Sequence, residues 1–340
     1  MCVALAGYLG GAGVVGASNK GRVMPQTGQI LRVPGWSAQQ ASGLLASGMA
    51  ARVLRNLLGV MSFDEYINAT SSDLDSLGIS RVDYREVDDA NEGVSVVLLG
   101  DDAYPVQLTV GPNPPVLLYV RGNISALSLG IGVVGTREAG EIAKATVPPC
   151  IAAAKELGVS VFSGLARGVD TMAHRGALEV GVATVAVLAT YPTRVNPEAN
   201  VGLAKEILES GGAVISESRE ATPRAGLYFA RNRIIAGLSS VVVPAEASLN
   251  SGTMGTVSDA LEWRRYLVVP VPGGARRNLL GAEALLALSG ETQLPLRGLR
   301  ISASLRSEIE KRGWVANACA AGPSELREFI RLGHLLSPLL

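Results

Sequence analysis

Short apolar runs alternate with polar segments over most of the chain between residues 130 and 273. The runs are rich in valine and alanine, and they lie at 130–135, 159–164, 182–189, 213–217, 239–246 and 266–273. Strands that are apolar along their whole length are typical of parallel sheets whose two faces are both covered. The pattern therefore predicts an α/β fold with a doubly wound, mostly parallel sheet.

Segments with helical spacing separate these runs, and they predict the helices that cover the sheet. These segments lie at 141–158, from Asp170 onward, near 198–210, within 222–238 and from about 253 to 264. We expect Pro148 and Pro149 to kink or split the first helix, because proline lacks an amide donor and clashes with the preceding turn. Asp170 is expected to be an N-cap rather than a catalytic acid.

The rest of the pattern divides the chain into further regions. Residues 1–28 form an apolar, glycine-rich lead-in, for which disorder is one alternative, and 29–82 predict a small helical module of helix-hairpin-helix or SAM-like type. The sheet domain is expected at 96–290. Two helical patterns lie within 291–340, where we find no winged-helix pattern.

Composition and charge narrow the class of protein. The formal net charge is zero, so no global field attracts nucleic acid, although a local basic groove remains compatible with this balance. The chain has three cysteines and no CxxC pair, which supports neither a disulfide framework nor a zinc site. The apolar start carries no early Lys or Arg and is too short to span a bilayer. We expect a cytoplasmic protein without a membrane partner.

Loops rich in glycine, arginine and serine follow the apolar runs. They cover residues 163–178, 228–239, 246–256 and 269–274. Backbone amides at a strand end that opens a helix can hold a phosphate, as can arginine side chains in such loops. The sequence therefore predicts an anion site at the strand ends, built in part from Gly135, Thr136 and Arg137 after the first run. His174 is expected to be a structural hydrogen-bonding residue, and no catalytic or cofactor-binding arrangement stands out.

In these loops the chain resembles the DNA-processing protein A family, also called Smf. The resemblance rests on Gly135-Thr136-Arg137, the SGLARGVDTMAHRGAL run at 163–178, RNRIIAGLS at 231–239, the 246–256 loop and VPG at 271–273. It implies an extended Rossmann-like domain, preceded by the helical module, that binds single-stranded DNA without catalysis and without a cofactor. It also implies a homodimer that loads a RecA-type recombinase onto strands coated by single-strand-binding protein, protecting incoming DNA during natural transformation.

The resemblance and the loop pattern together give a set of expected DNA-contacting residues. They are Gly135, Thr136, Arg137, Ser163, Gly164, Arg167, Arg175, Arg224, Tyr228, Phe229, Arg231, Asn232, Arg233, Ser251, Gly252 and Thr253. Arg231 has a second interpretation as a buried structural residue. The chain departs from the family at Tyr228, where phenylalanine is usual, and in the loop at 191–194. The alternative function is that of a nucleotide-binding phosphoribohydrolase-like enzyme or nucleotide sensor, which the 251–262 segment faintly resembles.

Overall fold

The structure is a computed structural model that divides the chain into two compact units, residues 1–119 and 120–340. It describes residues 93–98, 103–111, 114–115, 117–218, 220–248, 251–270, 299–312 and 316–337. The predicted lead-in and helical module therefore lie outside the described residues. No described helix combines the length and apolar character needed to cross a membrane.

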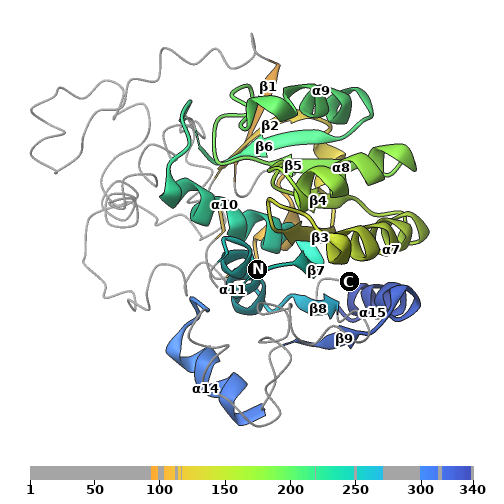
Figure 1. The fold of residues 1–340 in the computed structure, drawn as a ribbon. Helices are drawn as coiled ribbons and strands as arrows, with labels where there is room; N and C mark the ends of the chain where they lie inside the picture. Colours follow the sequence, from red (N-terminus) through yellow and green to blue (C-terminus); the bar gives the residue numbers. More distant parts are fainter. Residues whose placement is uncertain are drawn as a thin grey trace, which may run out of the picture. The chain divides into compact units, whose positions relative to one another are not determined.

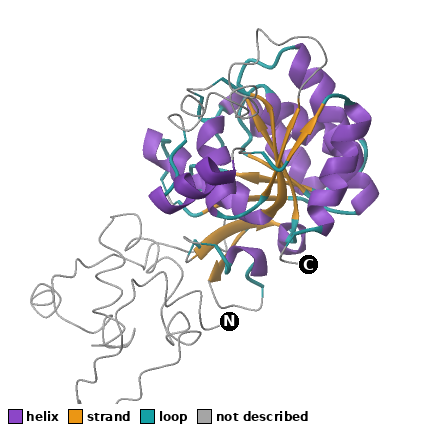
Figure 2. Cartoon of the chain, turned by 90° about the horizontal axis from the view of Figure 1, so that it is seen from below, coloured by secondary structure: helices purple, strands orange, loops and turns teal. Residues whose placement is uncertain are grey.

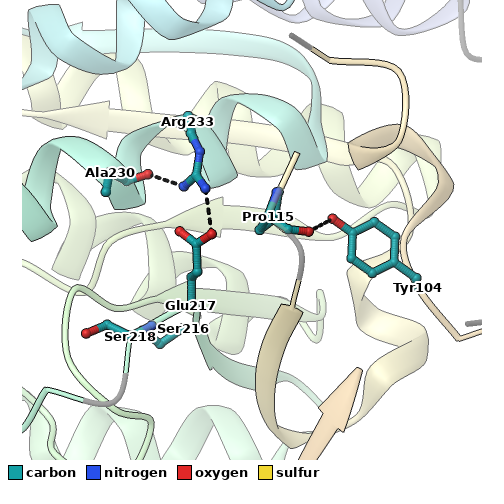
Figure 3. Close-up of polar contacts among 7 residues, drawn as sticks. All are labelled: Tyr104, Pro115, Ser216, Glu217, Ser218, Ala230 and Arg233. Carbon is teal, nitrogen blue, oxygen red and sulfur yellow. Dashed lines mark hydrogen bonds and ion pairs between the residues drawn. The ribbon is translucent and has the colours of Figure 1, made fainter. Parts of the chain in front are cut away.

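The described part of the first unit is small and built around buried apolar side chains. It contains strand β1 (Val94–Leu98), the 3-10 helix η2 (Val106–Leu108) and the start of β2 (Leu117–Gly122). The hydroxyl of Tyr104 donates a hydrogen bond to the carbonyl of Pro115 (Figure 3). Leu108 and Leu118 are fully buried.

The second unit is dominated by a parallel sheet. Its described strands are β3 (Gly130–Gly135), β4 (Val161–Ser163), β5 (Thr184–Val187), β6 (Ala213–Ser216), β7 (Ser239–Glu246), β8 (Tyr266–Pro270) and β9 (Ala318–Ala320). They are ordered β6-β5-β4-β3-β7-β8-β9, and each of these neighbouring pairs is parallel. The end of β2 neighbours β6. The predicted doubly wound, mostly parallel α/β sheet is confirmed.

Helices cover both faces of this sheet, as Figure 2 shows. One face carries α7 (Glu141–Leu157), α8 (Val169–Glu179), α9 (Val201–Glu209) and α15 (Pro323–Leu335). The other face carries α10 (Ala225–Leu238) and α11 (Thr253–Glu262) (Figure 1). The remaining helices are the 3-10 turns η3 (Ile124–Leu127) and η4 (Glu198–Asn200) and helix α14 (Ala303–Arg312).

Small apolar side chains make this layered packing possible. Val133 and Val243 on the central strands are fully buried against Ala143 and Ala173 of the covering helices, in one continuous cluster. Alanine on the helix and valine on the strand let the backbones approach closely, and burial of such surface contributes about 25 cal/mol for each Å² removed from water. The low aromatic content of the chain, 4%, fits a core of this kind.

Two local predictions differ from the structure. Pro148 and Pro149 do not split α7, which runs as one helix from Glu141 to Leu157. The carbonyls that lose their amide partners belong to Lys144 and Ala145, which are exposed, so water can hydrate them. At the C-terminal end, a strand that the sequence pattern did not indicate, β9, lies between the two predicted helices and pairs with β8.

The connections create a switch point in the middle of the sheet. From β3 the chain winds outward through β4 and β5 to β6, then crosses back so that β7 lies on the other side of β3. Loops that leave β3 and β7 therefore diverge to opposite faces. In open α/β sheets, ligands bind at the carboxyl ends of the strands beside such a point. The residues after β3, β4 and β7 are therefore the candidates for a ligand site.

Candidate nucleic-acid interface

The loop after β4 forms the base of the site, and its polar groups are held by internal hydrogen bonds. Ser163 is fully buried, and its hydroxyl donates to the carbonyl of Val133 at 2.6 Å. One carboxylate oxygen of Asp170 accepts from the amides of Gly164 and Ala166, at 3.1 and 3.2 Å. The N-cap of α8 is Gly168, so the prediction that Asp170 caps this helix was wrong. Its carboxylate instead shapes the loop.

Asn200 fixes the other side of the same loop. Its side-chain amide donates to the carbonyl of Leu165 at 2.8 Å and to the hydroxyl of Thr171 at 2.9 Å. Leu165 has a φ of 57°, a left-handed conformation that is costly for a leucine and persists only where surrounding contacts impose it. Sequence reasoning did not find Asn200, because it lies one strand further along the chain. Its only signal was a polar residue beside the start of the helix at 201–209.

Arg231, on α10, lies against this loop from the face of the sheet opposite to α8. Only 8% of its surface is exposed, and its Nε is buried without a hydrogen-bond partner among the described residues. A Cβ on Gly164 would lie 1.5 Å from Nη1 of Arg231, so glycine at that position leaves the room that the guanidinium occupies. Burial lowers the pKa of Arg231, and the carboxylate of Asp170 offsets part of this effect. We call Ser163, Gly164, Asp170, Asn200 and Arg231 the floor of the site.

Exposed cations and an aromatic ring stand above the floor. Arg137, in the loop after β3, is exposed, and its guanidinium carbon lies 5.5 Å from the centre of the Tyr228 ring. The Tyr228 hydroxyl donates to the side-chain oxygen of Asn196 at 3.3 Å, which orients the ring. Arg137 also lowers the pKa of Arg231, so the two positive charges act on one another. An anion between them would relieve that repulsion.

The other arginine of the RNR motif has a different environment. Arg233 forms an ion pair with Glu217, with Nη2 and Oε1 2.6 Å apart, and donates from Nη1 to the carbonyl of Ala230 (Figure 3). Both side chains of the pair are largely buried, at 12% and 19% exposure. The expected DNA contact of Arg233 is not supported by this arrangement, because its charge is already neutralised inside the protein.

The backbone amides at the start of α7 already have a hydrogen-bond partner, whereas the sequence predicted that they would hold a phosphate. The carboxylate of Glu246, at the end of β7, accepts from the amides of Gly140 and Ala143 at 2.9 and 3.1 Å. A carboxylate at a helix N-terminus satisfies free amides and the helix dipole as a phosphate would. Anion binding beside β3 therefore falls to side chains, of which Arg137 is the exposed one.

The remaining predicted residues divide into an exposed group and a structural group. Arg167 and Arg175 are exposed, and Arg224 is exposed and forms an ion pair with Glu220. Arg175 lies in the second turn of α8, about 9 Å along the helix axis from its start, which carries it away from the strand ends. We call Arg137, Arg167, Arg224 and Tyr228 the rim of the site.

Around the start of α11, the predicted residues mainly hold two helices together. Asn232 is buried, and its side-chain amide donates to the carbonyl of Gly252 at 3.2 Å. Thr253 is buried, and the Ser251 hydroxyl donates to the carbonyl of Ser248. These contacts fix α11 on α10. Phe229, by contrast, is 40% exposed.

His174 is a structural residue, as the sequence indicated. Its Nδ1 lies 2.7 Å from the hydroxyl of Thr184, which in turn donates to the carbonyl of Val161, so Nδ1 carries the proton. Nε2 is buried without a partner in the described part of the chain. Burial, with a contribution from Arg231, lowers the pKa of His174 to about 3, so the ring is neutral. Within the described residues no cluster of His, Cys, Asp or Glu could hold a metal ion.

The fold and this geometry together define an α/β protein with arginine side chains and a tyrosine ring beside the switch point of its sheet. Comparison with known proteins gives the family. A sequence model of the DNA recombination-mediator protein A family matches residues 95–292, more than half of the chain. The chain belongs to this family.

Similar proteins agree with this assignment. Protein Smf of Escherichia coli is 38% identical over 174 residues, which are 50% of this chain and 46% of that protein. DNA processing protein DprA of Streptococcus pneumoniae is 37% identical over 175 residues, 51% of this chain and 61% of that protein. The chain thus matches about half to three-fifths of their length. The X-ray structure of the Streptococcus pneumoniae protein aligns with a TM-score of 0.55 and 29% identity, covering 77% of this chain and 91% of that chain.

Proposed function

We propose that this chain binds single-stranded DNA at the floor and rim described above, without catalysing a reaction on it. The observation that carries the proposal is the pairing of a buried, incompletely satisfied arginine, Arg231, with an exposed arginine, Arg137, beside the Tyr228 ring. Guanidinium groups bind phosphates, and an aromatic ring stacks bases that are not already stacked in a duplex. The combination favours a single strand over a double helix.

Within that activity, we infer a role as a recombination mediator. A protein that holds a single strand by its backbone leaves the sequence unread, which suits a carrier of arbitrary incoming DNA. The homodimer, the RecA-type recombinase and the displaced single-strand-binding protein belong to this proposal, as does a part in natural transformation. Membership of the DNA recombination-mediator family supports it.

The role as a mediator is tested by filament assembly. We expect the protein to shorten the lag in ATP hydrolysis by a RecA-type recombinase on single strands coated with single-strand-binding protein, and to scatter light as a dimer. The matched control is Arg137→Ala, which should leave the lag long while keeping the dimer. A monomeric protein that leaves the lag unchanged would refute the mediator role.

The enzyme alternative is separated by a different measurement. A phosphoribohydrolase would release the base from a nucleoside monophosphate, so the assay is base release monitored by chromatography. The carboxylate that such an enzyme would use is Asp259, which lies within α11. Burial raises the pKa of Asp259 to about 7. The positive charge of Arg233 opposes this shift, and the negative charge of Glu262 adds to it. We expect no base release, and release that disappears in Asp259→Asn would favour the enzyme.

A further inference from the structure

A second arginine–aromatic pair involves Phe229, the residue of α10 that follows Tyr228. The guanidinium carbon of Arg300 lies 4.1 Å from the centre of the Phe229 ring, which is closer than the 5.5 Å between Arg137 and Tyr228. Because neighbouring residues of a helix point about 100° apart, the two rings face different directions. The start of α10 therefore presents two separate aromatic rings, Tyr228 and Phe229. Each ring contacts an arginine from another part of the chain.

The pair of Arg300 and Phe229 is built into the fold. Leu299 is buried, the amide of Arg300 donates to the hydroxyl of Ser258 on α11 at 2.9 Å, and the amide of Ser302 donates to the carboxylate of Glu262. The backbone at 299–302 is thus fixed along α11 while the Arg300 side chain stays exposed. Where the structure describes the chain, that side chain has the ring as its contact and forms no ion pair.

Phe229 is held in a similar way. A Cβ on Gly255 would lie 3.4 Å from the edge of the Phe229 ring, so the ring packs on α11 at a residue without a side chain. The ring nevertheless keeps 40% of its surface exposed. The nearby carboxylates are engaged elsewhere, since Glu262 accepts from Ser302 and Asp259 acts on Arg233. An exposed ring next to a cation that has no counter-ion among the described residues is suited to a base and its phosphate.

We propose that Phe229 and Arg300 form a second nucleotide-binding position for the same DNA strand. A base would stack at Phe229, and the Arg300 guanidinium would contact a neighbouring phosphate. Phe229 lies within residues 95–292, which the family model matches, whereas Arg300 lies beyond them, so this position adds a cation from outside the matched range. The inference rests on the proposed single-stranded DNA binding and extends it by setting the length of strand that one chain holds.

The test is a ladder of oligothymidylates from about 4 to about 16 nucleotides, the range of site sizes for one binding module, titrated by fluorescence anisotropy. The variants are Arg300→Ala and Phe229→Leu, with Arg331→Ala, an exposed arginine of α15 on the other face of the sheet, as the matched control. Arg300→Ala and Phe229→Leu should bind the shortest oligomers as the wild type does and the longer ones about tenfold more weakly. Arg300→Ala should also lower the salt dependence on long oligomers by about one phosphate contact.

The outcomes separate the two proposals. If Arg137→Ala loses affinity while both second-position variants bind every length like the wild type, the second position is refuted and the proposed function stands. An equal loss at all lengths in Arg300→Ala would also overturn it, because Arg300 would then belong to the first position. If the wild type binds none of the oligomers, the proposed function itself fails. Phe229→Leu keeps the apolar packing on α11, so it reports on stacking if Arg300→Ala folds poorly.

Discussion

The floor and the rim of the site are built on opposite principles. In the floor, Asp170 and Asn200 form hydrogen bonds with the backbone of one loop, which contains a leucine with positive φ and lies against Arg231. In the rim, Arg137 is exposed and Tyr228 is half-buried, and the two side chains contact each other. In the proposed function, the floor would determine where a phosphate sits, and the rim would supply the charge and the stacking surface. Changes to the floor should therefore affect folding and binding together, and changes to the rim should affect binding alone.

The largest effect is expected from Asp170→Ala. The substitution frees two amides of a buried loop and removes the carboxylate that acts on Arg231, and each buried group left unsatisfied costs about 1–3 kcal/mol. Urea unfolding should show this loss, and DNA binding should fall as well. Glu198→Ala, an exposed acid in η4, is the control and should change stability by less than about 0.5 kcal/mol. A stable Asp170→Ala protein with normal DNA binding would show that the floor determines neither stability nor binding.

Gly164→Ala should act on binding through Arg231. The new methyl group would overlap Nη1 of Arg231, so the guanidinium must leave its position beside the loop. We expect a loss of affinity for single-stranded DNA of at least about tenfold, the range for a charge-assisted contact. Gly226→Ala is a matched control on α10, where a Cβ meets nothing within 4 Å. Unchanged affinity in Gly164→Ala would show that Arg231 does not contact the DNA.

Arg137→Ala tests the rim. Because the side chain is exposed and contacts only the face of Tyr228, its removal should leave the unfolding midpoint unchanged and weaken DNA binding by about 1–3 kcal/mol. The control is Arg175→Ala, a second exposed arginine that lies further along α8. Thermal unfolding measures the midpoint, and calorimetric titration with a single-stranded oligomer measures the binding free energy. Equal losses from the two variants would mean that the effect is one of general charge rather than of the site.

The smallest effect concerns pH. The folded-state pKa of His174 is about 3, below its ordinary value, so its contribution to stability is present above pH 6.5 and is lost as the pH falls toward 3. The other histidine, His334, also has a lowered pKa through burial, and its Nδ1 lies 2.7 Å from the hydroxyl of Ser240. Over one pH unit the change in the free energy of unfolding is at most about 1.4 kcal/mol for one such group.

Unfolding midpoints at several pH values check this expectation. His174→Asn should flatten the decline of stability between pH 6.5 and pH 4.5, and His334→Asn should flatten it less, because His334 retains 8% exposure. A decline that neither substitution alters would assign the acid sensitivity to other groups.

The sequence predicted the sheet well because its signal is local. Continuous apolar runs such as 130–135 and 239–246 became β3 and β7 with nearly the predicted bounds. The strand β9 was missed, since three residues, Ala318 to Ala320, carry too short a pattern. The unbroken helix α7 was also missed, because the cost of Pro148 and Pro149 depends on whether water can reach two carbonyls, which the sequence does not show.

The site was predicted in part, and its failures come from contacts between distant segments. The pattern identified loops that the fold brings to one end of the sheet, but it did not separate Arg231 from Arg233, which belong to the same motif. Their different roles depend on Glu217, which is 16 residues from Arg233 and pairs with it. Likewise, Glu246 neutralises a helix start 106 residues away, where a phosphate was expected. Such pairings are set by the topology of the sheet, and a single sequence does not reveal them.

The central claim is that the site binds single strands through phosphate contacts and base stacking. Its most direct test is the titration of the wild type and Tyr228→Ala with single-stranded and duplex oligomers of one sequence at two salt concentrations. We expect a clear preference of the wild type for the single strand, binding that weakens as salt rises, and loss of much of the preference in Tyr228→Ala. Equal affinity for the duplex, or binding that does not depend on salt, would contradict the claim.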